Sequence, residues 1–136
     1  MQLDQDSKKI TIGFFFLRVT VFLVMLMWTV DKLVRPDHAS SVFRNFYYLE
    51  DVGNSVMMAI GGIELLILFG FLCGLKKKFT YGFVLVAHTI STLSSFKQYL
   101  SPFEGPNLLF FAAWPMLAAC FVLYLARERD TLLVVK

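Results

Sequence analysis

The stretch Ser55-VMMAIGGIELLILFGFLCG-Leu75 decides the fold, because it is apolar over its whole length except at Glu64. A helix that crosses the hydrocarbon core of a membrane needs about 20 consecutive, mostly apolar residues. The stretch meets this requirement, and its glycines suit a helix that packs closely against others in lipid. We therefore predict a transmembrane helix over residues 55–75.

Three other segments of the chain meet or nearly meet the same length requirement: residues 10–33, 79–96 and 107–126. The fourth span carries no charge, and in it we expect Pro115 to kink the helix because it removes the amide that would bond the carbonyl of Phe111. The sequence therefore predicts an all-α fold. We expect a bundle of four transmembrane helices that forms a single membrane domain over residues 1–136.

The composition disfavours a soluble enzyme. Hydrophobic residues make up 57% of the chain and charged residues only 17%, whereas a soluble domain averages about 45–50% and about 25%. The net charge of +3 is too small, and too concentrated at the ends of the segments, for a nucleic-acid-binding surface. We therefore expect this chain to contact the lipid bilayer and to bind no nucleic acid.

Basic residues are concentrated on one side of the predicted bundle. With both termini inside, the inner flanks carry Lys8, Lys9, Lys76, Lys77, Lys78, Arg127, Arg129 and Lys136. The outer flanks carry only Arg35, Arg44 and Lys97, with Lys32 at the boundary. Because lysine and arginine favour the cytoplasmic side of a membrane, we predict that both termini are cytoplasmic.

The long connection between the first two predicted spans contains a further helix. Apolar and aromatic residues recur there near helical spacing, from Val42 to Leu49, and Pro36 precedes them. We predict a short amphipathic helix around Ser40–Leu49 that lies at the outer membrane interface. A lid over the mouth of the bundle is the alternative interpretation.

Ionisable residues inside the spans are costly in hydrocarbon, so each should face the interior of the bundle and have a partner. Counted at about 1.5 Å per residue from the inner lysines, Arg18 lies about 13 Å deep, Glu64 about 18 Å and His88 about 15 Å. We therefore predict a buried polar layer in which Arg18 contacts Glu64 and His88 lies nearby.

Two further side chains belong with this layer by helical phase. Lys32 shares one face of the first span with Arg18, and Thr92 lies with His88 on a polar stripe of the third span. The candidates for a ligand-binding site or buried polar layer are therefore Arg18, Glu64, His88, Thr92 and Lys32.

Each of these candidates also has a purely structural interpretation. An Arg18–Glu64 pair can lock the register of two helices without any further role. His88 is either a hydrogen-bonded packing residue or a ligand or proton group. Lys32 either guards the outer mouth of the bundle or extends to the lipid headgroups.

Small residues predict where helices approach closely. Gly61 lies one turn from Glu64 and leaves room for an arginine to reach across. Gly70 and Gly74 form a G-x-x-x-G pattern at the end of the second span. This pattern permits close contact within one chain or in a homodimer.

These residues resemble the DoxX-like family of small four-helix membrane proteins. The resemblance covers most of the chain as order and spacing, and the large side chains Met25, Met27 and Trp28 depart from it. The motifs that carry it are Leu17-Arg18, Val30-Asp31-Lys32-Leu33 followed by Pro36, Gly61-Gly62-Ile63-Glu64-Leu65-Leu66, and Gly70 and Gly74 with basic residues directly after.

The resemblance implies a small subunit beside a redox enzyme, such as a thiosulfate:quinone oxidoreductase, in a bacterial inner membrane. Other family members resemble assembly factors or oxidative-stress partners, and an animal branch is similar to chaperones for receptor channels. A fold shared by a family does not by itself decide among these roles.

Three functional hypotheses follow. The first is an accessory subunit of a quinone-linked membrane redox system that binds a quinone-like or lipid-like ligand within the polar-layered bundle. The second is a membrane assembly factor or chaperone without a ligand of its own. The third, a transporter or proton conduit through Glu64 and His88, has little room in four helices.

We expect no catalysis by the chain alone, because the sequence offers no nucleophile–base pair and no set of metal ligands. Cys73 and Cys120 have no metal-binding spacing, and His88 has no second intramembrane histidine for a haem. We therefore expect no metal and no haem, and we expect a membrane or membrane-associated protein as partner.

Overall fold

The structure is a computed structural model that describes the backbone of residues 2–135 and the side chains of residues 4–135. Within these residues every regular element is a helix, so the all-helical class predicted from the sequence is confirmed. The elements in chain order are α1 (Gln2–Val34), α2 (Pro36–Tyr47), α3 (Asn54–Leu72), α4 (Lys77–Ser94), α5 (Phe96–Leu100), the 3₁₀-helix η1 (Asn107–Ala112), α6 (Ala113–Leu125) and the 3₁₀-helix η2 (Arg127–Arg129).

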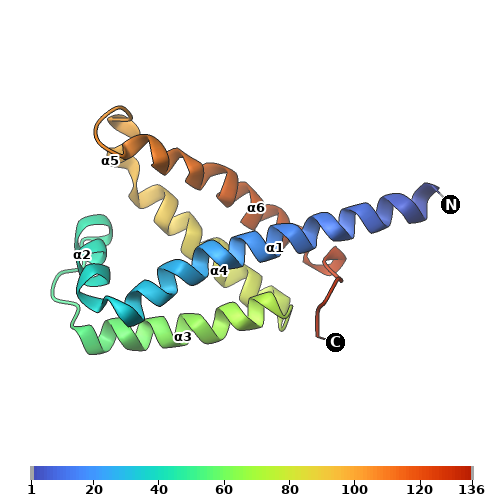
Figure 1. The fold of residues 1–136 in the computed structure, drawn as a ribbon, viewed down its shortest axis with the longest axis horizontal. Helices are drawn as coiled ribbons and strands as arrows, with labels where there is room; N and C mark the ends of the chain where they lie inside the picture. Colours follow the sequence, from blue (N-terminus) through green and yellow to red (C-terminus); the bar gives the residue numbers. More distant parts are fainter. Residues whose placement is uncertain (1, 136) are drawn as a thin grey trace.

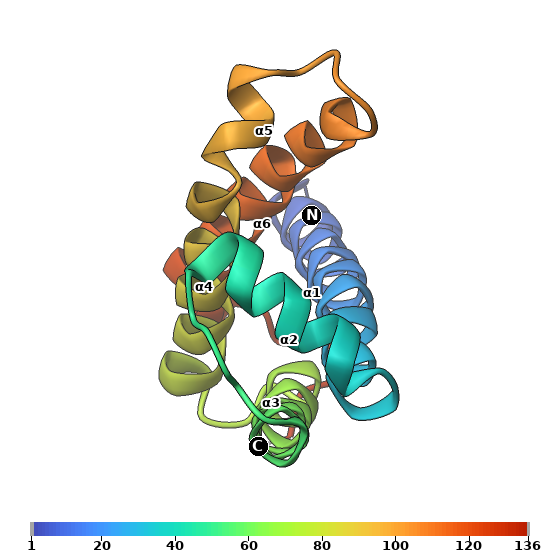
Figure 2. The same cartoon turned by 90° about the vertical axis from the view of Figure 1, so that its left-hand side faces the viewer.

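The long helices form two pairs. α1 packs mainly against α3, and α4 packs mainly against α6 (Figure 1). The short helices α2 and α5 lie at one end of the molecule, and α2 crosses the ends of the long helices there (Figure 2). The α3–α4 turn and both described ends of the chain lie at the opposite end (Figure 1).

Three helical segments are long and apolar enough to cross a membrane: Asp4–Val34, Asn54–Leu72 and Asn107–Leu125. They correspond to the first, second and fourth spans expected from the sequence. The third expected span is the helix α4, which is more polar and does not meet the same criterion within the described residues. The crossing of a membrane by α4, and with it the four-span bundle, is therefore still a prediction.

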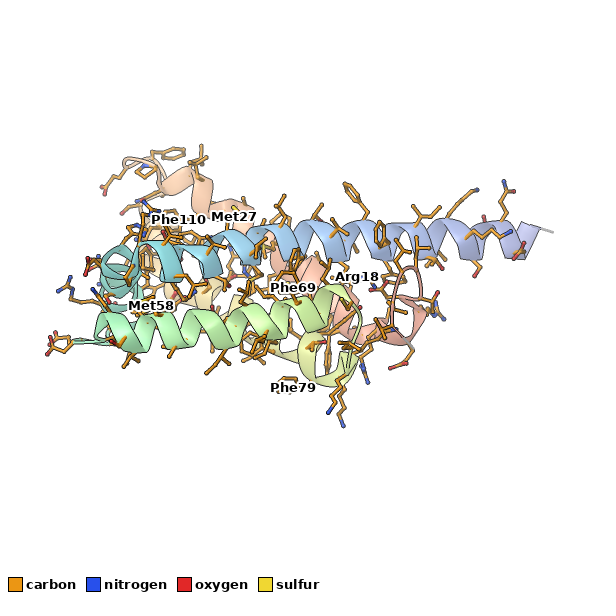
Figure 3. The ribbon with its side chains drawn as sticks, turned by 60° about the horizontal axis from the view of Figure 1, so that its bottom comes forward. Arg18, Met27, Met58, Phe69, Phe79 and Phe110 are labelled. Carbon is orange, nitrogen blue, oxygen red and sulfur yellow. The ribbon has the colours of Figure 1, made fainter. Side chains whose placement is uncertain are left out.

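Helix α1 is longer than its predicted span, because it begins at Gln2 rather than at Ile10. Its second half lies beside α3, where the rings of Phe22 and Phe69 lie 5.8 Å apart. Its first half extends past the end of α3, and Arg18 lies close to that end (Figure 3). The basic residues near the start of α1 are thus not level with those of the α3–α4 turn.

The connection predicted to hold a helix does contain one. Pro36 occupies the first turn of α2, where its fixed φ is favourable and its missing amide costs nothing. The helix ends at Tyr48, whose φ of 56° is left-handed, and Ser40 Oγ donates to the carbonyl of Val52 at 2.7 Å. The helix is therefore tied to the following loop, while its position at a membrane interface stays a prediction.

The uncharged fourth segment is not one uniform α-helix. It begins as the 3₁₀-helix η1 and becomes the α-helix α6 at Ala113. Pro115 thus lies in the first turn of α6, where a missing amide is tolerated. In place of a kink within one α-helix, the chain changes helix type just before the proline.

Apolar side chains cover much of the outside. Met58, Phe69 and Phe79 are exposed, and Phe79 extends away from the helix bundle (Figure 3). Such a surface suits lipid, where apolar side chains need no burial in protein. The buried core lies where the four long helices meet and comprises Phe14, Val21, Phe22, Leu68, Phe71, Tyr81, Val84, Cys120 and Leu123.

The α3–α4 turn depends on Gly74. Its φ of +69° is left-handed, and the amide of Leu75 donates to the carbonyl of Gly70 at 2.8 Å to close the helix end. A Cβ atom on Gly74 would lie 2.5 Å from Cγ1 of Val134. The Cβ of Gly70 would lie 3.2 Å from Thr80. Both glycines of the G-x-x-x-G pattern therefore serve contacts within the chain.

We predict that Gly74→Ala destabilises the protein by about 1–2 kcal/mol or more, because a left-handed φ is unfavourable for alanine and the new methyl group displaces Val134. Gly53→Ala is the matched control, since its φ is −66° and a Cβ there meets nothing within 4 Å. Unfolding in detergent, followed by helical circular dichroism, measures both changes. Equal effects of the two substitutions would contradict this account of the turn.

Candidate functional site

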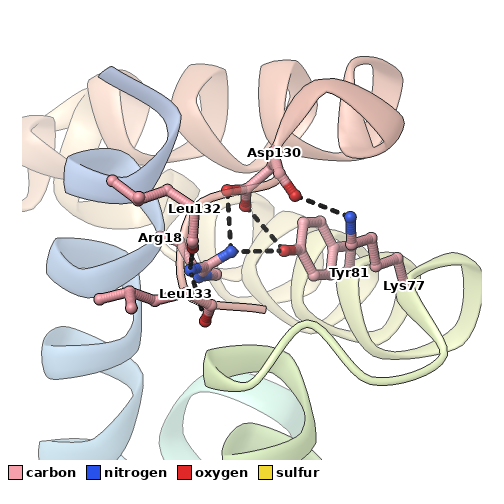
Figure 4. A network of polar contacts seen from close by, with 6 residues as sticks. All are labelled: Arg18, Lys77, Tyr81, Asp130, Leu132 and Leu133. Carbon is pink, nitrogen blue, oxygen red and sulfur yellow. Dashed lines mark hydrogen bonds and ion pairs between the residues drawn. The ribbon is translucent and has the colours of Figure 1, made fainter. Parts of the chain in front are cut away.

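The most deeply buried charges of the protein form a cluster between α1 and the C-terminal segment. The side chains of Arg18 and Asp130 are both 0% exposed, and Arg18 Nη1 lies 2.8 Å from Asp130 Oδ1. The hydroxyl of Tyr81 on α4 donates to Asp130 Oδ2 at 2.7 Å and accepts from Arg18 Nη1 at 3.4 Å (Figure 4). This ion cluster joins two helices and the C-terminal segment at one point.

Backbone carbonyls complete the surroundings of Arg18. Its Nη2 donates to the carbonyl of Leu132 at 2.5 Å and to that of Leu133 at 3.4 Å. From the other side, Lys77 Nζ donates to the carbonyl of Asp130 at 2.7 Å (Figure 4). The C-terminal segment thus offers oxygen atoms to two cations that belong to α1 and α4.

The same segment also closes the end of α3. The amide of Val135 donates to the carbonyl of Cys73 at 2.8 Å. Val134 packs onto Gly74, where no side chain stands in the way. The segment from Asp130 to Val135 therefore contacts three of the four long helices.

The energetics of this cluster are those of a buried ion pair. Removing two ions from water costs several kcal/mol each, and their attraction returns this only when the geometry is close and the remaining atoms are bonded. Arg18 and Asp130 meet the first condition with a short contact. They meet the second in part, because Tyr81 and the carbonyls bond Asp130 Oδ2 and Arg18 Nη2, while Arg18 Nε has no hydrogen-bond partner among the described residues. Each of the two charges is thus tolerable only while the other is present.

The predicted contact between Arg18 and Glu64 is wrong. Glu64 Oε2 instead lies 2.9 Å from Lys32 Nζ and accepts from Thr29 Oγ1 at 3.3 Å. Lys32 follows Arg18 by about 21 Å along the axis of α1. The depth count failed because it started from Lys9, which lies on the part of α1 that extends beyond α3.

Gly61 does make room for a close approach, although not for Arg18. A Cβ on Gly61 would lie 3.1 Å from the Cβ of Lys32 and 3.0 Å from Leu33. Lys32 is only 13% exposed, and its Nζ lies 6.0 Å from the ring centre of Phe43 on α2. The side chain of Lys32 therefore lies between α3 and α2 and does not extend to the surface.

His88 and Thr92 form a third, separate group. His88 Nε2 lies 3.0 Å from the carbonyl oxygen of Ala113, and Thr92 Oγ1 donates to the carbonyl of His88 at 2.7 Å. Both side chains are buried, and neither has a described polar contact with Arg18 or Glu64. The expected single layer is thus resolved into three groups with different neighbours.

A fourth polar group, which contains an ion pair, lies at the junction of α1 and α2. Asp31 is paired with Arg35 at 2.6 Å and with His38 Nδ1 at 2.7 Å. Asp31 and Arg35 are four residues apart on one helix, which is favourable spacing for a pair. His38 was not predicted to contribute, and it links the first turn of α2 to α1.

Asp130 is the important residue that the sequence analysis missed. It follows the charged run Arg127-Glu128-Arg129, and a run of this kind is typical of a solvated end. The apolar run Leu132-Leu133-Val134-Val135 directly after it is the signal that the segment packs onto the protein.

Two surface grooves are described on the molecule. A polar one of about 330 Å³ lies between α2 and the loop that follows, and an apolar one of about 610 Å³ lies between α4 and α6. Neither groove is lined by Arg18, Glu64, His88, Thr92 or Lys32. Among the residues whose side chains are described, no group of three His, Cys, Asp or Glu is arranged to hold a metal ion.

Comparison with models of protein families, with curated proteins and with solved structures finds no match. The resemblance to the DoxX-like family therefore stays a prediction that rests on the motifs in the sequence.

We predict that Arg18→Leu and Asp130→Leu each destabilise the protein by about 3–5 kcal/mol, because each leaves a buried charge without its partner. The double substitution should recover a large part of that loss. Unfolding in detergent measures the four members of this double-mutant cycle.

The matched cycle of Arg18→Leu with Glu64→Leu should instead be additive within about 0.5 kcal/mol, since the two side chains do not meet. Additivity in the first cycle, or coupling in the second, would show that the ion pair is assigned to the wrong residues.

Proposed function

We propose that the chain is an integral membrane protein with four spans and with both ends on the cytoplasmic side. Both described ends and the α3–α4 turn lie at one end of the bundle, together with most of the basic residues (Figure 1). An even number of crossings fits this arrangement, and basic residues favour the cytoplasmic side.

The proposal requires α4 to cross the membrane although it is the most polar of the long helices. Its polar residues Tyr81, His88 and Thr92 are buried in the protein. Its outward face carries exposed apolar side chains, for example Val86 and Ile90. A helix of this kind can cross lipid, because its polar groups are satisfied by the bundle.

We further propose that the protein is a non-catalytic accessory subunit of a membrane redox system and acts by contact with a membrane partner. The observation that carries this proposal is the internal pairing of its buried and partly buried ions. Arg18 is paired with Asp130, and Lys32 is paired with Glu64. Charged groups that are paired with each other in this way stabilise the fold and are not free to bind a ligand. The proposal that the partner is a redox enzyme rests on the DoxX-like resemblance.

Ligand binding is a second candidate, which the apolar groove between α4 and α6 favours. Thr89, Trp114, Ala118 and Phe121 are among the residues that line it. An isoprenoid or acyl chain, such as the tail of a quinone, matches a groove of this chemistry. The polar layer expected to hold the ligand does not contribute to it.

We predict that a cysteine at Lys78 is labelled only from the cytoplasmic side and a cysteine at Ser41 only from the opposite side. Both positions are partly or fully exposed, and both are placed in a chain with Cys73 and Cys120 replaced by alanine. Labelling of intact cells and of inverted vesicles with a membrane-impermeant maleimide measures this. Labelling of both positions from one side would overturn the four-span topology.

We predict that deletion of the gene in the native host lowers the abundance of a membrane redox enzyme, as measured by quantitative proteomics of the membrane fraction. The Arg18→Leu, Asp130→Leu double variant should restore that abundance as well as the unchanged chain does, provided that it reaches the membrane at the same level. Its buried charges are absent, so restoration shows that they have no chemical role.

Ala118→Phe, which fills the groove, separates the two candidates. If the protein is an accessory subunit, Ala118→Phe restores the abundance of the redox enzyme in the deletion strain. Mass spectrometry of the purified protein then finds no quinone. For a ligand-binding protein, a quinone copurifies with the unchanged chain and is lost from Ala118→Phe. Unchanged partner abundance after deletion would refute the accessory role.

A further inference from the structure

The C-terminal segment Asp130–Val135 is bound to the bundle as a peptide is bound to a receptor. It has no regular secondary structure. Its contacts are one buried carboxylate, a few backbone hydrogen bonds and Val134 against Gly74. The partners of these groups lie on α1, on α4 and at the end of α3.

The residues that receive the segment form a site for an acidic group. Tyr81 donates a hydrogen bond to the Asp130 side chain, Lys77 donates one to its backbone carbonyl, and Arg18 forms an ion pair with its carboxylate (Figure 4). Within the described residues Asp130 is the one acid that pairs with Arg18. The helices of the bundle thus supply the cations, and an acidic group must come from a segment outside them.

The site also has unused capacity. Arg18 Nε is buried and has no hydrogen-bond partner among the described residues. A guanidinium can bind a carboxylate through two parallel hydrogen bonds, and this geometry is stronger than a single contact. The resident segment uses Nη1 and Nη2 but leaves this third position unbonded.

Beyond Asp130 the segment is lightly held. Leu133 is 74% exposed and Val135 is 57% exposed. Leu133 has a φ of 51°, a left-handed conformation that costs about 1–2 kcal/mol for a residue of this kind. The carboxylate of Asp130 is therefore the main anchor, and the rest of the segment contributes little burial.

We propose that Arg18, Lys77 and Tyr81 form a binding site for an acidic peptide, and that the segment Asp130–Val135 is its resident ligand. A peptide segment with an aspartate followed by extended apolar residues replaces the resident one when it is supplied in trans. Simple loss of the segment is disfavoured, because it would leave Arg18 buried and unpaired. Exchange of one acidic segment for another avoids that state.

The test uses the full chain in detergent with a site for a sequence-specific protease inserted between Arg129 and Asp130. After cleavage, the binding of a fluorescent peptide with the sequence of residues 127–136 is measured by anisotropy. We expect saturable binding that an excess of the unlabelled peptide abolishes. The same peptide with Asp130→Asn should bind about ten- to a hundred-fold more weakly, because one charge-assisted bond is lost.

Two receptor variants test the site itself. Lys77→Met should weaken peptide binding several-fold, because Lys77 donates to the carbonyl of Asp130. Lys78→Met is the matched control, since it removes the same charge from the neighbouring residue, which is exposed and has no described bond to the segment. If both variants weakened peptide binding equally, the effect would come from the net charge and not from the Lys77 hydrogen bond, and the proposal would be overturned.

Cleavage could itself unfold the protein, so a second experiment uses chains that are not cleaved. The uncleaved Asp130→Asn variant has a weakened resident segment, so it should bind the labelled peptide, whereas the uncleaved native chain should bind far less. Failure of both the cleaved chain and this variant to bind the peptide, or equal binding of the Asp and Asn peptides, would overturn the proposal.

Discussion

A buried charge must find its counter-charge inside the protein, and the pair of Arg18 and Asp130 follows from this constraint. The arginine lies on the first helix and the aspartate lies after the last one, so the pair joins the first helix to the C-terminal segment. Tyr81 joins α4 to the same point, and two carbonyls of the C-terminal segment accept from Nη2 of Arg18. The path of the chain after α6 is therefore fixed by the arginine, because an extended route into solvent would leave it unpaired.

The helices could be predicted from the sequence because their signals are local. Long apolar runs define α1, α3 and the fourth segment, and Pro36 with the aromatic pattern after it defines α2. The pair of Asp31 and Arg35 was also accessible, since its spacing lies within one helix. A uniformly apolar span can be predicted from its own residues. A crossing by the more polar α4 depends on which of its side chains the bundle covers.

The candidate site was predicted less well, because it depends on how far one helix slides along another. Residues were aligned from their distance to the nearest lysines, which assumes that all helices begin at one level. That assumption does not hold, because α1 extends past α3. As a result Glu64 pairs with Lys32 and not with Arg18. Arg18, Glu64 and Lys32 were each expected to have a polar partner and do, but which partner each has depends on the register of α1 on α3. Asp130 was missed because its neighbours are charged and its burial comes from the apolar residues after it.

The position of Asp130 in the chain has a consequence for biogenesis. The ribosome delivers Arg18 to the membrane first, and the residue that neutralises it is synthesised only after every long helix. Until Asp130 has been made, Arg18 has no acidic partner among the described residues, and burying it unpaired would cost several kcal/mol. The pair of Arg18 and Asp130 consequently forms only after all four long helices have been synthesised. A chain that stops before Asp130 lacks the partner of Arg18, so burial of the arginine in such a chain would leave its charge unpaired.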